Sequence, residues 1–135
     1  MGKVRVLPMP NFAYFEIPAD NLPRAKKFYT SVLGWEITPT SMPAAMPAAM
    51  EYQDVKTGEP KEGTLSMGGM YRRQMPGAGP VFYAAVGDID GVLGKVAKLG
   101  GKIRQPRMMI EGVGPIALVE DTEGNVIGVW QPMMG

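Results

Sequence analysis

Glu16 is the carboxyl group of this sequence whose surroundings best suit chemistry, because it lies in an apolar, aromatic segment near the N-terminus. Tyr14 stands two residues before it, so on a β-strand both side chains point to the same face. If that face lines an apolar cleft, the carboxyl group would have a raised pKa and could act as a general base or a hydrogen-bond anchor. The alternative is a structural ion pair between Glu16 and a nearby Arg or Lys.

The absence of histidine and cysteine limits the chemistry of the chain. Zinc, iron and nickel sites are built from imidazole, thiolate and carboxylate donors, so the usual transition-metal centre is not expected. Ser31, Ser41 and Ser66 have no histidine to activate them, which removes the Ser-His-Asp mechanism. We therefore expect no metal and no cofactor, although magnesium or calcium bound by oxygen ligands alone stays open.

Two further motifs could bind a ligand. Tyr71-Arg72-Arg73 could offer forked guanidinium donors to an anion, or the arginines could simply be solvated. Met42, Met46 and Met50 are spaced by four, as in soft copper(I) thioether sites. The prolines between these methionines argue against one continuous helix that presents all three. We interpret this segment as an irregular flap whose methionines fill gaps.

Length and composition indicate one ordinary globular domain. The chain has 135 residues, of which 45% are hydrophobic and 20% charged. A net charge of +1 gives no electrostatic case for nucleic acid. No apolar run approaches the roughly 20 residues needed to cross a bilayer, and no signal-peptide pattern is present. The default expectation is a cytoplasmic protein without a membrane partner.

The secondary-structure elements that position Glu16 belong to a pattern of one strand, one helix and three strands, and this pattern occurs twice in the sequence. A strand over residues 11–17 ends at Pro18, and a helix follows that Asp20 or Asn21 caps and Gly34 ends. Its apolar residues share one helical face and are Leu22, Ala25, Phe28, Tyr29, Val32 and Leu33. Three further strands are predicted near residues 35–38, 50–55 and 63–71.

The second copy begins with a strand over residues 81–86. Asp88 caps its helix and Gly100-Gly101 ends it. Three strands again follow, over residues 102–108, 114–119 and 126–131. The sequence therefore predicts an α+β fold of two βαβββ modules, about 11–71 and 80–132, within a single domain over 1–135.

Short motifs in both halves carry a family resemblance. They are Phe15-Glu16-Ile17-Pro18-Ala19-Asp20, Phe28-Tyr29, Val32-Leu33-Gly34-Trp35, Asp88-Ile89-Asp90, Leu99-Gly100-Gly101-Lys102, Asp121-Thr122-Glu123-Gly124 and Gly128-Val129-Trp130-Gln131-Pro132. In order and spacing they resemble the vicinal-oxygen-chelate superfamily of glyoxalase I, bleomycin-resistance proteins and extradiol dioxygenases. The resemblance implies a curved mixed sheet around a cleft, with helices outside, and a homodimer.

The resemblance also implies where metal ligands stand in the family's enzymes. Three of these positions are Tyr14, Val81 and Gly128 here, and the fourth lies near Met67 to Gly69. None of the three mapped residues is a histidine or a carboxylate, so the resemblance implies the fold and the cleft without the metal chemistry.

The expected ligand site is an aromatic cleft with a few polar groups. Its predicted lining residues are Tyr14, Glu16, Met67, Val81, Tyr83, Gly128 and Trp130. The first hypothesis is a metal-free protein that binds a small aromatic or carbonyl-containing molecule. The alternative is a metal-independent lyase or isomerase in which Glu16 is the general base and Tyr14 the acid. An interaction domain with a vestigial cleft, or a set of plain core aromatics, also fits these residues.

Overall fold

The computed structural model describes residues 9–61 and 64–133 and divides the chain into two compact units. We call Ala13–Tyr83 the N-terminal unit, and Ala84–Gly135 together with the residues up to Phe12 the C-terminal unit. Strands β1 and β5 contribute residues to both. Each unit is described by itself.

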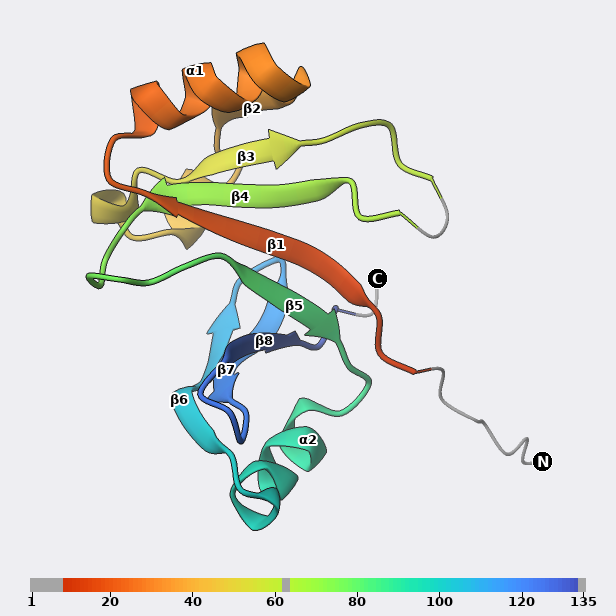
Figure 1. Ribbon diagram of the computed structural model, residues 1–135. Coiled ribbons are helices and arrows are strands. Elements are labelled where there is room, and N and C mark those ends of the chain that lie inside the picture. The colour runs from red at the N-terminus through yellow and green to blue at the C-terminus, as the bar shows by residue number, and fades with distance from the viewer. Residues whose placement is uncertain (1–8, 62–63, 134–135) are drawn as a thin grey trace, which may run out of the picture. The chain divides into compact units, whose positions relative to one another are not determined.

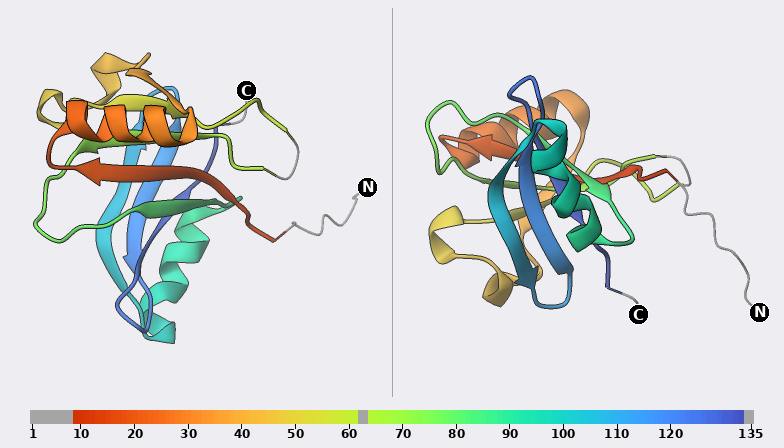
Figure 2. Two further views of the ribbon diagram at one scale, coloured as in Figure 1. Left: turned by 45° about the horizontal axis from the view of Figure 1, so that its top comes forward. Right: turned by 90° about the horizontal axis from the view of Figure 1, so that it is seen from below.

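The N-terminal unit holds a sheet with one long helix on one face (Figures 1 and 2). Its elements are β1 (Phe12–Ala19), α1 (Leu22–Leu33), β2 (Glu36–Pro39), η1 (Pro43–Ala45), η2 (Ala48–Met50), β3 (Gln53–Lys56), β4 (Met67–Arg72) and the first three residues of β5 (Val81–Ala85). The strand order is β2-β3-β4-β1, followed by β5. Strands β1 and β4 are parallel, whereas β2, β3 and β4 are antiparallel neighbours.

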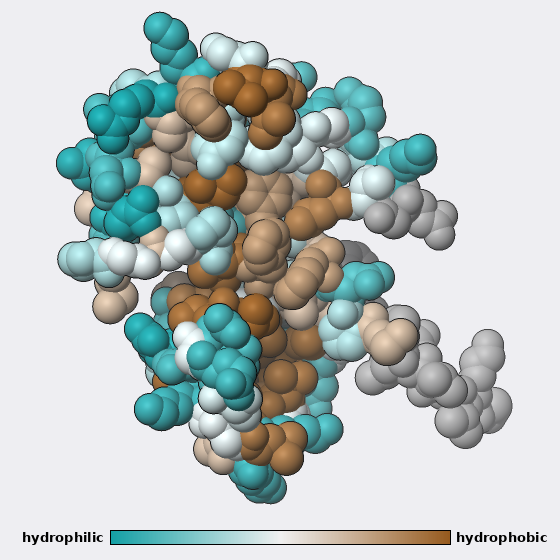
Figure 3. Space-filling view, in the orientation of Figure 1, coloured by the Kyte–Doolittle hydropathy of each residue, from teal (hydrophilic) through white to brown (hydrophobic). Residues whose placement is uncertain are grey.

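The core of the N-terminal unit lies between α1 and the sheet. Its buried residues are Phe15, Ala19, Leu22, Ile37, Val55 and Met70. Ala25 and Tyr29 of α1 pack against this core, but Phe28, Val32 and Leu33 are 53–61% exposed. The predicted apolar face of the helix was therefore too wide, because only the stripe through Leu22, Ala25 and Tyr29 reaches the sheet. Apolar side chains over α1 are visible in brown at the top of Figure 3.

Strand β1 continues past Pro18, which corrects the expected end of this strand. The carbonyl of Ala19 accepts a hydrogen bond from the amide of Arg73, at 2.9 Å. Backbone groups of successive strand residues point to opposite edges, so the proline nitrogen of Pro18 faces away from β4. The missing N–H therefore costs the β1–β4 ladder nothing, and Pro18 pairs in register with Tyr71.

The C-terminal unit repeats this organisation. Its elements are the last residues of β5, α2 (Ile89–Val96), η3 (Ala97–Leu99), β6 (Lys102–Ile110), β7 (Gly114–Glu120) and β8 (Val126–Trp130). The strand order is β5-β8-β7-β6, and β7 is antiparallel to both β6 and β8. Val86, Ile89, Ala117 and Val129 form its buried core.

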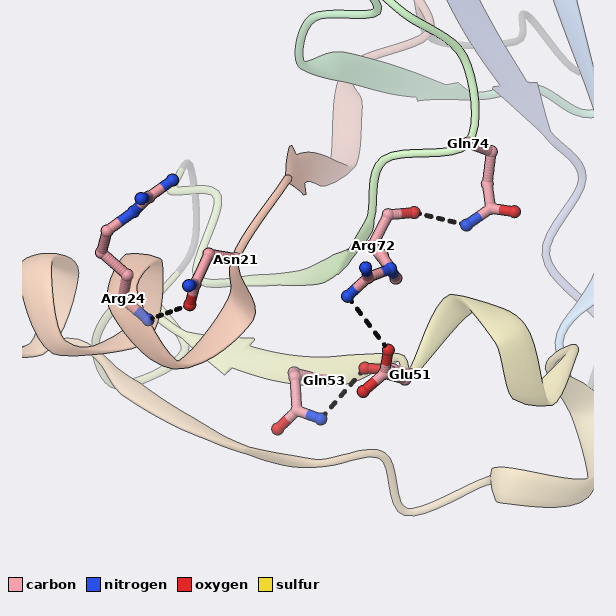
Figure 4. A network of polar contacts seen from close by, with 6 residues as sticks. All are labelled: Asn21, Arg24, Glu51, Gln53, Arg72 and Gln74. Atoms are coloured by element: carbon pink, nitrogen blue, oxygen red, sulfur yellow. Dashed lines mark hydrogen bonds and ion pairs between the residues drawn. The ribbon is translucent and has the colours of Figure 1, made fainter.

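Both helices begin as the sequence predicts, with Asn21 rather than Asp20 as the cap of α1. Helix α1 also ends as predicted, whereas α2 ends at Val96 and the 3-10 turn η3 extends it to Gly100. The side chain of Asn21 accepts from the amide of Arg24 (Figure 4), and that of Asp88 accepts from the amide of Gly91. Gly34 and Gly100 follow with left-handed φ angles of 72° and 95°, which glycine adopts without strain. The element order confirms an α+β fold built from two βαβββ modules.

The methionine segment of residues 42–50 is irregular as predicted, but the two strands that follow it begin later than predicted. The methionine segment forms the two short 3-10 turns η1 and η2, so it is irregular as expected. Strands β3 and β4 begin at Gln53 and Met67, later than predicted, and part of the turn between them lies outside the described residues. Within residues 9–61 and 64–133, no helix combines the length and apolarity required to cross a bilayer.

Met70 gives a direct test of the N-terminal core. Its side chain is fully buried, so Met70→Ala should lower the free energy of unfolding by about 2–5 kcal/mol through lost burial and a residual cavity. Met75 is 59% exposed, and Met75→Ala should change it by less than about 0.5 kcal/mol. Chemical denaturation measures both, and equal effects of the two substitutions would contradict this core.

Candidate functional site

The candidate site lies on the face of the N-terminal sheet opposite α1. Residues alternate along β1, so Phe15 and Ile17 face the helix while Tyr14 and Glu16 face the other side. Tyr83 reaches Glu16 from the neighbouring strand β5, and Tyr52, which directly precedes β3, reaches it from two strands away. All four residues belong to the N-terminal unit, and we call them the tyrosine–glutamate cluster.

Hydrogen bonds join the cluster into one chain. The hydroxyl of Tyr83 donates to Oε1 of Glu16 at 2.7 Å, and that of Tyr52 donates to Oε2 at 2.8 Å. The hydroxyls of Tyr14 and Tyr52 are 2.7 Å apart. Tyr52 has a single proton, which Glu16 accepts, so Tyr14 must be the donor in the Tyr14–Tyr52 bond. With Glu16 ionised, all three hydroxyl protons point inward along the chain.

The lack of a side chain at Gly69 allows the Tyr52 hydroxyl to reach Glu16. In the sheet β4 lies between β3 and β1, and Gly69 pairs with Asp54 on one side and with Glu16 on the other. A Cβ atom on Gly69 would overlap the Tyr52 hydroxyl. The missing side chain therefore opens a path for the Tyr52 ring across β4 to the carboxyl group.

Aromatic packing fixes the rings. Tyr14 and Tyr83 meet edge to face, with centroids 6.2 Å apart and an interplanar angle of 67°. Tyr71 of β4 stacks on Tyr52, with centroids 6.4 Å apart and an interplanar angle of 7°. Tyr52 and Tyr83 are each only 5% exposed, whereas Tyr14, Glu16 and Tyr71 are half-buried. Tyr14 and Tyr71 are thus the more exposed tyrosines around Glu16, and the register of β1 and β4 places them on opposite sides of it along the strand.

Burial controls the ionisation of the cluster. Desolvation raises the pKa of Glu16 above its ordinary value of 4.5, although the bonds from Tyr83 and Tyr52 act in the opposite direction. Desolvation and the nearby charge of Glu16 also raise the pKa of Tyr14, to about 12. The same two causes raise the pKa values of Tyr52 and Tyr83, so these hydroxyls stay protonated and can donate.

One expectation for Glu16 was an ion pair with an Arg or Lys. Its carboxyl oxygens instead accept hydrogen bonds from two tyrosines. Among the described residues, the ion pairs involve other carboxyl groups, and none includes Glu16. Its negative charge is stabilised by two neutral hydroxyl donors rather than by a cation. The cluster is thus a partly buried carboxyl group with raised pKa, aromatic walls and a hydroxyl relay.

The other predicted lining residues have different positions. Val81 is buried at the start of β5, and Met67 is 55% exposed at the start of β4. Gly128 and Trp130 lie on β8 of the C-terminal unit, where the indole N–H of Trp130 donates to the carbonyl of Val113 at 2.9 Å. Their place in one site with Glu16 stays a prediction.

Tyr52 was not predicted as a site residue. Tyr71 was named only in the arginine motif, and Gly69 only as one end of the range that holds the fourth metal-ligand position. Tyr52 and Asp54 alternate along the chain and so share a face, which is the one signal available in the sequence. The strand order that brings Tyr52 across Gly69 to Glu16 is a tertiary feature that this alternation does not predict.

The two arginines of the Tyr71-Arg72-Arg73 motif already have carboxylate partners. Arg72 lies 3.6 Å from Glu51 (Figure 4), and both side chains are about half exposed. The Nε atom of Arg73 donates to Asp20 at 2.8 Å, and its Nη1 atom donates to the carbonyl of Ala78. These contacts favour a structural role over capture of an anion.

Two hollows of the N-terminal unit lie away from the cluster. One has a volume of about 540 Å³ and borders the Asp20–Arg73 ion pair and residues 74–77. The other, of about 300 Å³, lies on the face of Phe15 and Ile17 and is lined almost entirely by apolar groups. Neither hollow is lined by Tyr14, Glu16, Tyr52 or Tyr83.

The residues at the family's metal-ligand positions do not fit a metal ion. Val81 and Gly128 have no side-chain donor atom, and the Tyr14 hydroxyl is engaged with Tyr52. Across the described part of the chain, no three Asp or Glu side chains gather closely enough to form a cation site.

Comparisons of the sequence identify a family. The model of the "Glyoxalase/Bleomycin resistance protein/Dioxygenase superfamily" matches residues 11–129. CFP32 of Mycobacterium bovis, which carries a provisional glyoxylase name, is 31% identical over 109 residues, or 79% of this chain and 40% of that protein. A glyoxylase-like domain-containing protein of Didymella fabae is 32% identical over 113 residues, or 82% of this chain and 84% of that protein. The chain thus spans less than half the length of the mycobacterial relative.

Solved structures show the same fold at low identity. A hypothetical protein of Bacillus halodurans C-125 has a TM-score of 0.69 at 12% identity, covering 95% of this chain and 98% of that one. Methylmalonyl-CoA epimerase of Streptomyces coelicolor has a TM-score of 0.66 at 14% identity, covering 91% and 97%. At these identities the likeness concerns the fold alone.

Gly69→Ala should displace Tyr52 from Glu16, because the new methyl group occupies the position of the hydroxyl. We expect the free energy of unfolding to fall by about 1–3 kcal/mol, as for other overpacked sites, when measured by chemical denaturation. Gly58→Ala is the control, since a Cβ atom there meets nothing within 4 Å. A Gly69→Ala protein as stable as the control would contradict the placement of Tyr52.

The raised pKa of Glu16 predicts a specific pH dependence. Above pH 4.5 and below the raised value, the folded protein holds the Glu16 proton that the unfolded chain has released. Stability should therefore fall as pH rises through this window, and Glu16→Gln should remove that fall. Glu111→Gln, which deletes an exposed carboxyl group in a turn, should leave it in place. Denaturation curves across pH that run parallel for wild type and Glu16→Gln would show that the carboxyl group is not desolvated.

Proposed function

Because the chain belongs to the glyoxalase/bleomycin resistance protein/dioxygenase superfamily, we propose that it binds a small aromatic or carbonyl-containing molecule at the tyrosine–glutamate cluster, without a metal ion. The observation that carries this proposal is the hydrogen-bonded chain of Tyr14, Tyr52, Glu16 and Tyr83. Ligand sites typically combine aromatic walls with a few precisely placed polar groups, and this cluster has both.

The cost of burying Glu16 supports a functional role. A desolvated carboxyl group destabilises the fold unless its hydrogen bonds compensate. With a cationic partner, or with an apolar residue in its place, the folded state would be destabilised less. Four tyrosines surround this group, and two of them, Tyr14 and Tyr71, remain half-buried and so within reach of a ligand. Groups held in this way are concentrated at binding and catalytic sites.

A metal-independent reaction is the second candidate function. The raised pKa of Glu16 brings its proton affinity toward that of a useful general base, which is the specific observation in its favour. The hydroxyls of Tyr52 and Tyr14 would relay a proton between Glu16 and a molecule on Tyr14. Glu16→Gln distinguishes the candidates, because it would abolish turnover but only weaken the binding of a ligand.

Binding can be tested with a panel of small aromatic molecules by NMR chemical-shift mapping. We expect the amide shifts to gather at residues 14–16, 52, 69–71 and 83, and to be unchanged by a chelator. Tyr71→Ala should weaken binding about fivefold or more, because it removes an aromatic wall. Phe28→Ala is the matched control, since Phe28 is an exposed aromatic residue of α1.

Three outcomes would contradict the proposed function. These are shifts confined to α1, equal losses of affinity in the two variants, and the absence of binding by every aromatic compound. Loss of binding after chelation would contradict its metal-free character alone.

A further inference from the structure

The direction of the hydroxyl protons determines what the cluster can offer to a ligand. Each phenol has one proton, and the three protons of Tyr14, Tyr52 and Tyr83 are all donated within the cluster when Glu16 is ionised. The outward-facing lone pairs of Tyr14 can only accept. Glu16 as a carboxylate also only accepts. The polar surface of the cluster therefore contains acceptors and no free hydroxyl donor.

The charges around Tyr14 act in the same direction. Glu16 and Asp54 both place negative potential at its hydroxyl, and Tyr83 of β5 packs against its ring. Arg73 acts on Tyr71, and its guanidinium pairs with Asp20. A partial positive charge on a ligand atom would be favoured at the Tyr14 oxygen, and a carbonyl oxygen would be repelled.

We propose that the cluster selects aromatic molecules that donate a hydrogen bond, such as ring N–H or phenol compounds, and rejects those whose polar group is a carbonyl acceptor. Tyr14 contacts the donor, and Tyr52 and Glu16 are positioning residues that fix the direction of its proton. This inference rests on the proposed function, and it narrows the ligand class from aromatic or carbonyl-containing to donor-bearing aromatic.

The physical reason for the selection is the cost of an unpaired acceptor. A carbonyl placed against the Tyr14 oxygen would lose its water and gain no donor, and the two oxygens would repel each other. An N–H group of a ligand would donate to the Tyr14 oxygen and so extend the hydrogen-bonded chain from the cluster to the ligand. Sites whose polar groups are fixed in this way discriminate strongly against ligands that lack the matching group.

The test compares indole with 1-indanone, two bicyclic molecules of similar size that carry an N–H donor and a carbonyl acceptor. Titrations are followed by NMR at a pH above the raised pKa of Glu16, which the pH dependence of its carboxyl carbon shift locates first, so that Glu16 is ionised. Wild type should bind indole at least about tenfold more tightly than 1-indanone, which corresponds to one good hydrogen bond.

Tyr52→Phe tests the relay itself. It removes the acceptor of the Tyr14 proton, so Tyr14 can donate to a carbonyl, and the preference for indole should fall to about threefold or less. Tyr29→Phe is the control, because Tyr29 packs from α1 against the opposite face of the sheet and its hydroxyl lies outside the chain of Tyr14, Tyr52, Glu16 and Tyr83. It should keep the wild-type preference. Should Tyr52→Phe fail to fold, Tyr14→Phe serves instead, and it should weaken indole binding alone.

The outcomes separate the two proposals. Equal binding of indole and 1-indanone by wild type, or an unchanged preference in Tyr52→Phe, would overturn the inference and leave the proposed function standing. The absence of binding by both molecules at the cluster would overturn the proposed function, and the inference with it.

Discussion

The desolvated carboxyl group of Glu16 is the constraint on which the rest of the site depends. Its charge has no cationic partner in the described part of the chain, so the surrounding strands supply two hydroxyl donors at 2.7 and 2.8 Å. Each donor must arrive at hydrogen-bond distance, which fixes the register of the strands that carry Tyr52 and Tyr83. The third hydroxyl, on Tyr14, completes the chain and belongs to a half-buried residue, whereas Tyr52 and Tyr83 are buried.

Two adjacent glycines of β4 adapt the sheet to this requirement. Gly68 and Gly69 face opposite sides, and a Cβ atom on either would overlap an aromatic ring, that of Phe15 on the core side and that of Tyr52 on the cluster side. The core and the site are therefore coupled through one strand. A glycine pair weakens a strand on its own, so close approach of the two rings is what explains its presence here.

Local signals predicted much of the fold, and tertiary features explain what they missed. Capping and left-handed glycines depend on a few neighbouring residues. Asp88 and Gly34 were predicted correctly, Asn21 was one of two predicted caps, and Gly100 ends the 3-10 turn that follows α2. The continuation of β1 past Pro18 was missed, because a proline ends a strand only where its nitrogen faces the neighbouring strand. Which way the nitrogen faces depends on how β1 pairs with β4. Two-residue spacing placed Tyr14 beside Glu16, but only the order of β3, β4 and β1 reveals Tyr52 as a partner of Glu16.

Neutron diffraction from a deuterated crystal, grown at a pH above the raised pKa of Glu16, would test the hydroxyl relay most directly, because it locates the protons of the cluster. The account predicts a deuteron from Tyr14 directed at Tyr52, deuterons from Tyr52 and Tyr83 directed at Glu16, and none on the carboxyl group. A deuteron on Glu16, or a Tyr14 deuteron directed away from Tyr52, would contradict it.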